Sequence, residues 1–569
     1  MKHLFSCLKS YRKEAVLSPL FKLFEATLEL LVPLVVGAIV NNGIASADVS
    51  YIVYGCLILV GLGAVGLAFS LTAQYFAARA AVGVSAELRE RLFVKLQSFS
   101  YTQIDRTGTS AMITRMTSDV NQVQTGVNMT LRLFLRSPFI VLGAMAMAFV
   151  VDPTSALVFV AVIPLLGAAV SAIMAACLPL YKKVQERLDK VYLSTRENLT
   201  GVRVIRAFCK EEDEIAEFKS RNGALKREQK KVGRIAALMN PLTYVLVNLA
   251  VVALLWVAAG RVNLGALEQG NVISLYSYLA MILVELVKFA NLVVTVTRAV
   301  SSQKRIGVVL DEEGETDSPD SSAQEDTEVA VRFERVTFSY EGGGAPALKG
   351  INLSVRRGET VGILGGTGSG KSTLVNLIPR FYTASEGKVF VNGRDVNAYS
   401  AEELREKIGV VPQKAALFRG TIRSNLLWGK EDATEEELFS ACRTAQAEDV
   451  VAAKGGLDGE IAQEGRNLSG GQRQRLTIAR ALVKKPEILI LDDSSSALDY
   501  ATDARLRAAL RKLDCTVFIV SQRASSVMHA DQILVLDDGA PAGLGTHEQL
   551  LASCEVYREI YDSQFGGKS

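Results

Sequence analysis

Residues 360–373 read T-V-G-I-L-G-G-T-G-S-G-K-S-T. The opening T-V-G-I-L is a short apolar run typical of a buried strand, and the residues after Gly370 suit a helix. Between them, Gly365–Thr373 matches the pattern G-x-x-x-x-G-K-[ST]. Glycines allow consecutive backbone N–H groups to surround an anion, and the start of the helix adds a favourable dipole. The order of strand, glycine-rich turn and helix therefore predicts an α/β domain with a phosphate-binding P-loop.

The same loop predicts a site for a nucleotide and Mg²⁺. Lys371 is expected to reach the β- and γ-phosphates, and Ser372 is expected to coordinate the metal. A second apolar run, Ile488–Leu491, ends in Asp492 and Asp493, so Asp492 is the expected carboxylate ligand of Mg²⁺. Asp493 is in a position to orient the attacking water. The P-loop and strand-end residues expected to bind ATP are Gly365, Gly366, Thr367, Gly368, Ser369, Gly370, Lys371, Ser372, Thr373 and Asp492.

Short apolar runs alternate with helical stretches throughout the C-terminal part of the chain. The clearest runs are Thr360–Leu364, Lys388–Val391, Ile488–Leu491 and Thr516–Val520. Strands that alternate with helices predict an α/β domain with a largely parallel sheet. We assign this domain to residues 329–569. Residues 311–328 are acidic and polar, almost without apolar side chains, which is typical of a linker.

The N-terminal part, residues 1–310, has the composition of a membrane domain. The chain of 569 residues is too long for one ordinary domain. Its mean hydropathy is +0.22 even though 22% of its residues are charged, which indicates a membrane part joined to a soluble part. Six apolar segments have roughly the length that spans a bilayer. They are Leu17–Asn42, Tyr51–Ala78, Met129–Val151, Thr154–Leu180, Ala236–Gly260 and Val272–Thr295.

Loop charges predict the orientation of these six helices. Residues 181–235 contain 15 Lys or Arg, and the connection between the second and third helices is also basic. The short connections after the first and third helices carry no basic residue. The positive-inside rule then places both long connections, the C-terminal domain and both termini in the cytoplasm. Residues 80–128 and 181–235 are expected to extend the membrane helices by about 30 Å or more, at roughly 1.5 Å per residue.

Bulk charge and metal-binding residues exclude other classes of protein. A net charge of +3, from 63 basic and 60 acidic residues, gives no reason to expect nucleic-acid binding. Seven cysteines are scattered without a CxxC pair, so we expect reduced structural thiols. Three histidines are too few for a metal site based on imidazole.

Three acidic residues interrupt the apolar segments. They are Glu25 and Glu29 in the first segment and Glu285 in the sixth, where Lys288 follows. A charge that faces lipid is costly, so such residues usually face a cavity or a partner helix. One interpretation is a polar lining for a cationic or amphipathic cargo. The other is an interhelical hydrogen bond or a position at the membrane edge, and the sequence does not choose between them.

Further motifs in the C-terminal domain resemble the ATP-binding cassette (ABC) proteins. N-L-S-G-G-Q-R-Q-R, Asn467–Arg475, contains L-S-G-G-Q, which is similar to the signature of that family. The resemblance implies that Ser469, Gly470, Gly471 and Gln472 contact the ATP held by another chain.

Tyr340 in V-T-F-S-Y resembles the aromatic residue that stacks on adenine. Gln413 in G-V-V-P-Q resembles the glutamine that joins the Mg²⁺ shell to the membrane domain. Asp499 in S-A-L-D resembles the loop that crosses to the other cassette, and G-T-H-E-Q-L (545–550) resembles the closing segment.

The membrane half also resembles the exporter type of this family. Asp105–Val120 is similar to its first cytoplasmic loop and Glu197–Phe208 to its second. The resemblance implies a half-transporter that works as a pair, uses ATP and Mg²⁺, and exports an amphipathic drug, lipid or peptide across a bacterial plasma membrane. Transmission is expected through Gln413 and the segments Thr109–Arg115 and Arg206–Cys209. An importer built on the same plan and an ATP-gated regulator or channel are the alternatives.

The chain departs from the family pattern at two catalytic positions. Asp493 stands where the family has a glutamate that polarises water, and Gln522 stands where it has a histidine that contacts the γ-phosphate. With an intact signature, these changes favour a heterodimer in which this chain supplies the weaker ATP site. The alternative is a homodimer in which Asp493 is sufficient for catalysis.

Overall fold

The computed structural model describes residues 2–315 and 328–565, which form two compact units. The first contains Met1–Leu96 and Ser110–Glu312, and the second contains Gln97–Thr109 and Glu313–Ser569. Residues 97–109 therefore pack with the C-terminal unit, although the sequence assigned them to the membrane half. Most of the expected linker, residues 316–327, lies outside the described residues.

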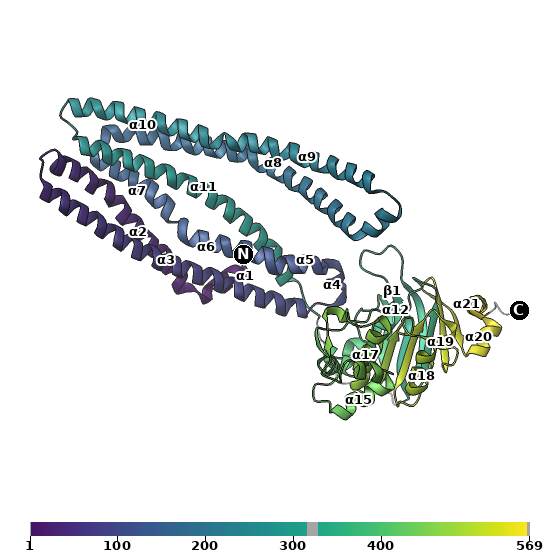
Figure 1. The fold of residues 1–569 in the computed structure, drawn as a ribbon. Helices are drawn as coiled ribbons and strands as arrows, with labels where there is room; N and C mark the ends of the chain where they lie inside the picture. Colours follow the sequence, from purple (N-terminus) through teal and green to yellow (C-terminus); the bar gives the residue numbers. More distant parts are fainter. Residues whose placement is uncertain (1, 316–327, 566–569) are drawn as a thin grey trace. The chain divides into compact units, whose positions relative to one another are not determined.

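The first unit is entirely helical in its described residues. Its helices are α1 (Lys2–Ser10), α2 (Arg12–Ala38), α3 (Val49–Gln97), α5 (Thr109–Thr114), α6 (Val120–Leu133), α7 (Arg136–Val151), α8 (Pro153–Ala207), α9 (Glu211–Ala237), α10 (Met239–Asn263) and α11 (Gln269–Asp311). Two π-helical segments, η1 (Ile39–Ile44) and η2 (Arg115–Asp119), continue α2 and precede α6. Figure 1 shows α8 and α9 side by side, and α11 beside α6 and α7.

Six helical segments of the described residues are long and apolar enough to cross a membrane, as the sequence predicted. They are Arg12–Ile44, Val49–Gln97, Thr109–Val151, Pro153–Ala207, Glu211–Asn263 and Gln269–Asp311. Helix α3 has 49 residues and α8 has 55, whereas the apolar core of a bilayer needs only about 20. The predicted extensions are therefore continuous with the spanning helices. The turn between α8 and α9 is short, and it begins at Phe208, within the expected transmission segment Arg206–Cys209.

Small residues allow close helix packing in the first unit. A Cβ atom added to Gly270 of α11 would lie 2.2 Å from the carbonyl oxygen of Gly37 in α2, so the two backbones touch. One turn further along α11, Ser274 donates a hydrogen bond of 2.7 Å to the carbonyl oxygen of Pro33. Tyr278 donates another, of 2.8 Å, to that of Leu30. These contacts are typical of membrane helices, which associate through close packing and interhelical hydrogen bonds.

The second unit contains two main sheets. Its strands are β1 (Val329–Phe338), β2 (Leu348–Arg356), β3 (Thr360–Gly365), β4 (Glu386–Val391), β5 (Arg394–Asp395), β6 (Ile408–Val411), β7 (Gly420–Thr421), β8 (Glu460–Ile461), β9 (Ile488–Asp492), β10 (Thr516–Ser521), β11 (Gln532–Asp537) and β12 (Ala540–Gly545). Six of them form a sheet in the order β12-β11-β3-β10-β9-β6, parallel except for the edge strand β12.

The second sheet was not expected from the sequence. Strands β2, β1, β4 and β5 form an antiparallel sheet, so the run Lys388–Val391 is a strand but does not belong to the parallel sheet. Both faces of β9 and β10 are buried, as expected for the centre of a parallel sheet. In β2 buried and exposed residues largely alternate, because one face of that sheet is exposed to solvent.

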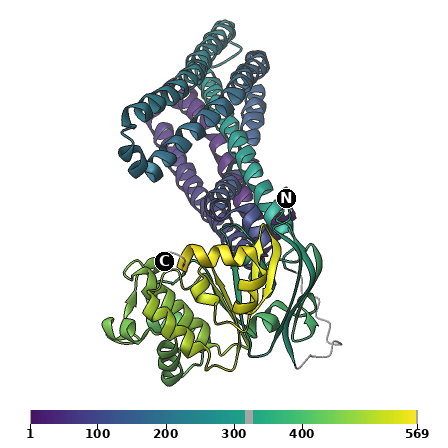
Figure 2. The same ribbon diagram turned by 90° about the vertical axis from the view of Figure 1, so that its right-hand side faces the viewer.

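Helices surround these sheets. They are α4 (Tyr101–Thr107), α12 (Lys371–Leu377), α13 (Ala401–Glu406), α14 (Ile422–Leu426), α15 (Glu435–Thr444), α16 (Glu448–Ala453), α17 (Gly470–Val483), α18 (Tyr500–Leu510), α19 (Ala524–Val527), α20 (His547–Ser553) and α21 (Glu555–Phe565). Figure 2 shows the green helices of residues 435–483 grouped at one side of this unit. One apolar core lies between the two sheets, and a second joins the parallel sheet to α15 and α17.

Candidate nucleotide site

The glycine-rich loop joins the end of β3 to the start of α12. Gly370 caps this helix with a φ of +94°, a left-handed conformation in which a side chain would be strained. A Cβ atom there would also lie 2.7 Å from the carbonyl oxygen of Ala347. Gly366, Thr367 and Gly368 are exposed at the tip of the loop. The local backbone therefore requires glycine at the position the motif predicts.

The ammonium group of Lys371 lies inside the loop. It donates to the carbonyl oxygens of Gly365, at 2.9 Å, and Gly366, at 2.5 Å. The residue is only 8% exposed, and burial lowers the pKa of its side chain, an effect that the nearby carboxylates of Asp493 and Asp492 oppose. The structure thus keeps a cationic side chain beside the exposed backbone of the loop, where an anion would bind.

Ser372, in the first turn of α12, and Asp492, at the end of β9, come together in the structure. The Ser372 hydroxyl donates a hydrogen bond of 2.9 Å to Oδ1 of Asp492, the last residue of β9. Asp492 is 7% exposed, and burial raises the pKa of its carboxyl group. A hydroxyl and a carboxylate are oxygen ligands of the kind that Mg²⁺ takes beside phosphate groups. The donor set therefore fits the expected metal.

The two unusual positions lie at the same edge of the sheet. Asp493 directly follows β9, and Nε2 of Gln413 lies 3.4 Å from its Oδ2. Gln522 directly follows β10, and its Oε1 accepts a hydrogen bond of 3.4 Å from the hydroxyl of Thr367 in the loop. Parallel neighbouring strands bring these residues together, because their carboxyl ends meet at one edge.

Tyr340 lies beside the helix that follows the loop. Its hydroxyl group is 2.9 Å from that of Thr373 in α12, and its ring meets the ring of Phe338 edge to face at 4.9 Å. The side chain is 40% exposed, so part of the ring is open to a ligand. A cavity of about 860 Å³ adjoins it, and its lining includes Asp105 and Tyr382.

Sequence reasoning did not find Asp105 and Tyr382 as neighbours of this site. Both come from segments without a recognisable nucleotide motif. For Asp105, the sequence S-Y-T-Q (100–103) could have indicated that a helix begins nearby. In the structure it forms the capping box at the start of α4.

The signature segment begins a helix. The side chain of Ser469 accepts a hydrogen bond from the backbone N–H of Gln472, and Oε1 of Gln472 accepts one of 2.8 Å from the N–H of Ser469. Gly470 is open, whereas a Cβ atom on Gly471 would lie 3.0 Å from the carbonyl oxygen of Ala497. Among the described residues, no hydrogen bond joins this segment to Gly365–Thr373. The predicted contact with the ATP of another chain stays a prediction.

Asp499 has a clear local role. It caps the N-terminus of α18 by accepting a hydrogen bond of 2.9 Å from the N–H of Thr502, which also lowers the pKa of its carboxyl group. The cap explains an aspartate at this position without a second chain. Contact with the other cassette stays a prediction.

Each acidic residue of the apolar segments has a cationic partner. Arg136 of α7 donates from Nη1 to Glu285 at 2.6 Å and from Nη2 to Glu29 at 2.6 Å. Ser137 and Lys288 each donate a further hydrogen bond of 2.8 Å to Glu285, which is 2% exposed. Glu25 pairs with Lys22 at 2.5 Å. The contacts of Glu29 and Glu285 with Arg136 agree with the interhelical interpretation, whereas Glu25 and Lys22 pair within α2. A cargo lining by Glu25, Glu29 and Glu285 stays a prediction.

Comparison with known proteins identifies the family. The family "ABC transporter transmembrane region" matches residues 16–286, and the family "ABC transporter" matches residues 348–496. The ABC transporter ATP-binding protein YfiB of Bacillus subtilis is 36% identical over 567 residues, which cover 100% of this chain and 99% of the relative. The chain belongs to the ABC transporter family. This ABC transporter is also 31% identical over 580 residues to the putative multidrug export ATP-binding/permease protein YgaD of Bacillus subtilis, with 99% of each chain covered.

Two other similarities are more distant. The ATP-dependent lipid A-core flippase of Escherichia coli is 29% identical over 543 residues, covering 95% of this chain and 92% of the relative. A bacterial Atm1-family ABC exporter, solved with ATP bound, shares the fold with a TM-score of 0.83 at 24% identity, covering 97% and 99% of the two chains.

The expected half-transporter, a membrane domain fused to an ATP-binding cassette, is therefore confirmed, as is its class as a multi-pass exporter subunit with bacterial homologues. The cassette is an ATPase coupled to transport, and half-transporters of this type dimerise in the membrane.

Proposed function

We propose that this chain is one subunit of a heterodimeric ABC exporter and that the ATP site built on its own P-loop hydrolyses slowly. The observation that carries the proposal is the pair of residues at the ends of β9 and β10, Asp493 and Gln522. A second subunit would supply the P-loop and catalytic glutamate of the faster site, and this chain would complete that site with Ser469, Gly470 and Gly471.

The side chain of Asp493 is short for the role of orienting water. It has one methylene fewer than glutamate, which removes about 1.5 Å of reach, one carbon–carbon bond. A misplacement of roughly 1 Å can cost about 100-fold in rate, because phosphoryl transfer depends on positioning and charge stabilisation. Gln522 retains hydrogen-bonding groups near Thr367, but an amide neither takes up a proton nor carries charge. Both replacements therefore lower turnover because they weaken positioning and charge stabilisation at the site of phosphoryl transfer.

The groups for binding ATP remain. Lys371 would pair with the β- and γ-phosphates, and Tyr340 would stack on adenine. Ser372, Asp492 and Gln413 would hold Mg²⁺, which neutralises charge on the phosphates when bound. The hydrogen bond from Ser372 to Asp492 supports this assignment, because it brings two oxygen ligands to one point. We therefore expect tight nucleotide binding without fast hydrolysis.

Cargo and orientation follow from different observations. One relative is named as a putative multidrug export protein and another as a lipid A-core flippase, so the cargo we propose is amphipathic, a drug, lipid or peptide. The 15 basic residues of 181–235 support, through the positive-inside rule, our proposal that the extended helices, the cassette and both termini lie in the cytoplasm of a bacterial cell.

ATPase turnover of the chain purified alone in lipid nanodiscs tests the proposal. We expect ATP binding with slow turnover, and a rise of about tenfold or more for the double variant Asp493→Glu/Gln522→His, because it restores reach and a titratable group. Asp493→Asn is the matched control, since it removes the carboxylate without changing the length of the side chain. Brisk turnover of the unaltered chain that Asp493→Asn abolishes would contradict the proposal and favour the homodimer.

A further inference from the structure

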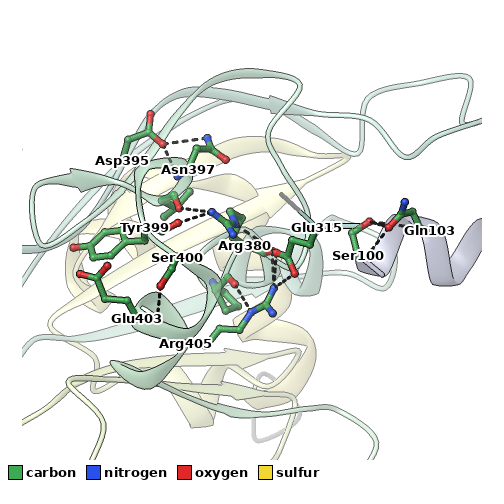
Figure 3. A network of polar contacts seen from close by, with 12 residues as sticks. Ser100, Gln103, Glu315, Arg380, Asp395, Asn397, Tyr399, Ser400, Glu403 and Arg405 are labelled. Carbon is green, nitrogen blue, oxygen red and sulfur yellow. Dashed lines mark hydrogen bonds and ion pairs between the residues drawn. The ribbon is translucent and has the colours of Figure 1, made fainter. Parts of the chain in front are cut away.

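Helix α4 is held against the cassette by residues that follow the membrane domain. The backbone N–H of Glu315 donates to the carbonyl oxygen of Ser98 at 2.8 Å, and Nε2 of Gln103 donates to that of Glu313 at 2.5 Å. Figure 3 shows the carboxylate of Glu315 turned the other way, toward Arg405 and Arg380. Nη2 of Arg405 lies 2.8 and 3.1 Å from its two oxygens. Residues 313–315 thus lie between α4 and the cassette and bind both.

Aromatic packing fixes the same helix from a second direction. The ring of Tyr101, the first residue of α4, stacks on that of Phe381 with centroids 4.4 Å apart and planes 22° apart. The guanidinium group of Arg405 lies 5.4 Å from the centroid of the Phe381 ring. With Arg405 also bound to Glu315, the ion pair and the aromatic stack share one residue. Helix α4 therefore has a defined position on the cassette.

A hydrogen bond and an aromatic contact continue from α4 to Tyr340. The hydroxyl of Tyr382 donates to Oδ2 of Asp105, in α4, at 2.7 Å. The ring of Tyr382 meets the ring of Tyr340 edge to face, with centroids 5.3 Å apart and planes at 82°. Burial, and then the bond to Asp105, raises the pKa of Tyr382, so its hydroxyl stays a donor at neutral pH.

The orientation of Tyr340 depends on these neighbours because the residue is not enclosed. It is 40% exposed, and it lines part of the adjoining cavity. Its ring is held by the edge contacts with Phe338 and Tyr382 and by the hydroxyl contact with Thr373. Of these partners, Tyr382 is the one that is bonded to α4.

We propose that Asp105 and Tyr382 are positioning residues for Tyr340, so that α4 sets the affinity of the cassette for the base of its nucleotide. The inference rests on the proposed stacking of Tyr340 on a purine. Asp105 holds the hydroxyl of Tyr382, Tyr382 holds the edge of Tyr340, and the face of Tyr340 meets the base. Binding of the phosphates to the P-loop does not pass through this path.

Equilibrium titration of the full-length chain in nanodiscs with two probes, ATP and inorganic tripolyphosphate, tests this inference. We expect Asp105→Ala and Tyr382→Phe each to weaken ATP binding by about 2- to 10-fold, the range of one hydrogen bond, and to leave tripolyphosphate binding unchanged. Both variants remove the same bond, so the double variant should lose no more than either single variant. Tripolyphosphate binding also reports that the variants are folded.

The control on the same helix is Arg106→Gln. It removes an ion pair of 3.3 Å with Glu341 in which both side chains are about half exposed, and we expect less than a twofold change, about the limit for exposed pairs. Equal weakening of both probes, no weakening of ATP, or an equal effect of Arg106→Gln would overturn the inference. The variant Tyr340→Ala distinguishes a failure of this inference from a failure of the proposed function. If that variant does not weaken ATP relative to tripolyphosphate, the stacking role itself is wrong. If it does while Asp105→Ala and Tyr382→Phe have no effect, only the role of α4 is wrong.

Discussion

Asp493 combines an unusual side chain with an unusual backbone. Its φ is +45°, in the left-handed region, and its N–H donates to the carbonyl oxygen of Val520 at 3.0 Å. Aspartate and asparagine adopt this conformation more readily than other residues with a Cβ atom, because their short polar side chains bond locally. The backbone at this position therefore favours the residue that the chain has over the longer glutamate.

This backbone predicts how substitutions at 493 affect stability. Asp493→Asn should leave the thermal unfolding of the detergent-purified chain unchanged, whereas Asp493→Glu should cost about 0.5–1 kcal/mol of strain. Asp493→Gly is the control for the backbone, since glycine adopts positive φ without a steric penalty. Equal melting temperatures for the Asp493→Glu variant and the unaltered chain would show that the turn relaxes and that strain does not oppose glutamate here.

At the scale of elements, an ion-pair cluster joins three membrane helices. Arg136 of α7 lies between Glu29 of α2 and Glu285 of α11, and it is only 7% exposed. Removing one partner of a buried pair leaves an uncompensated charge, which costs far more than losing an exposed pair. The cluster therefore acts as a structural connection whose charges depend on one another.

We predict that Arg136→Met destabilises the membrane unit by about 3–5 kcal/mol and that adding Glu285→Gln recovers much of the loss, because fewer unpaired charges stay buried. Thermal unfolding in detergent measures both effects. Lys210→Met is the control, since it removes an ion pair with Asp213 in which both side chains are exposed, and it should change little. If Arg136→Met melts like the unaltered chain while cargo-stimulated ATPase activity is lost, the acidic residues serve cargo and the structural interpretation is wrong.

At the scale of the whole molecule, cysteine exposure provides a test of orientation. Of the seven free cysteines, Cys56 and Cys209 are exposed and the other five are buried. Cys209 lies in the turn between α8 and α9, at the far end of the basic extensions. Ser46, in the connection between η1 and α3, is exposed at the predicted outer side.

A membrane-impermeant maleimide should react with Cys209 only after the cells are permeabilised. In a chain with Cys56→Ala and Cys209→Ala, the added substitution Ser46→Cys should react in intact cells. This result follows from the positive-inside rule applied to residues 181–235. Labelling of Cys209 in intact cells would reverse the orientation and place the extensions outside.

The parts of the site that could be predicted from the sequence are those whose residues lie within a motif or directly after an apolar strand. Gly365–Thr373, Asp492 and Asp493 follow apolar strands directly, so the motif and the strand pattern were sufficient to bring them together. The hydrogen bond between Tyr382 and Asp105 joins residues 277 positions apart, and neither lies in a nucleotide-binding motif. The antiparallel sheet was missed for a related reason, because strand pairing depends on partners that are distant in sequence.

The sequence by itself determined the six spanning helices, the α/β cassette and the chemistry of the P-loop, because periodicity, apolar length and glycine spacing act over a few neighbouring residues. Only the tertiary structure decided that residues 97–109 pack with the cassette and that Arg136 joins Glu29 to Glu285. It also decided which residues hold Tyr340. These features arise from side chains that meet only after the chain has folded, and their energy depends on burial and geometry that no local pattern carries.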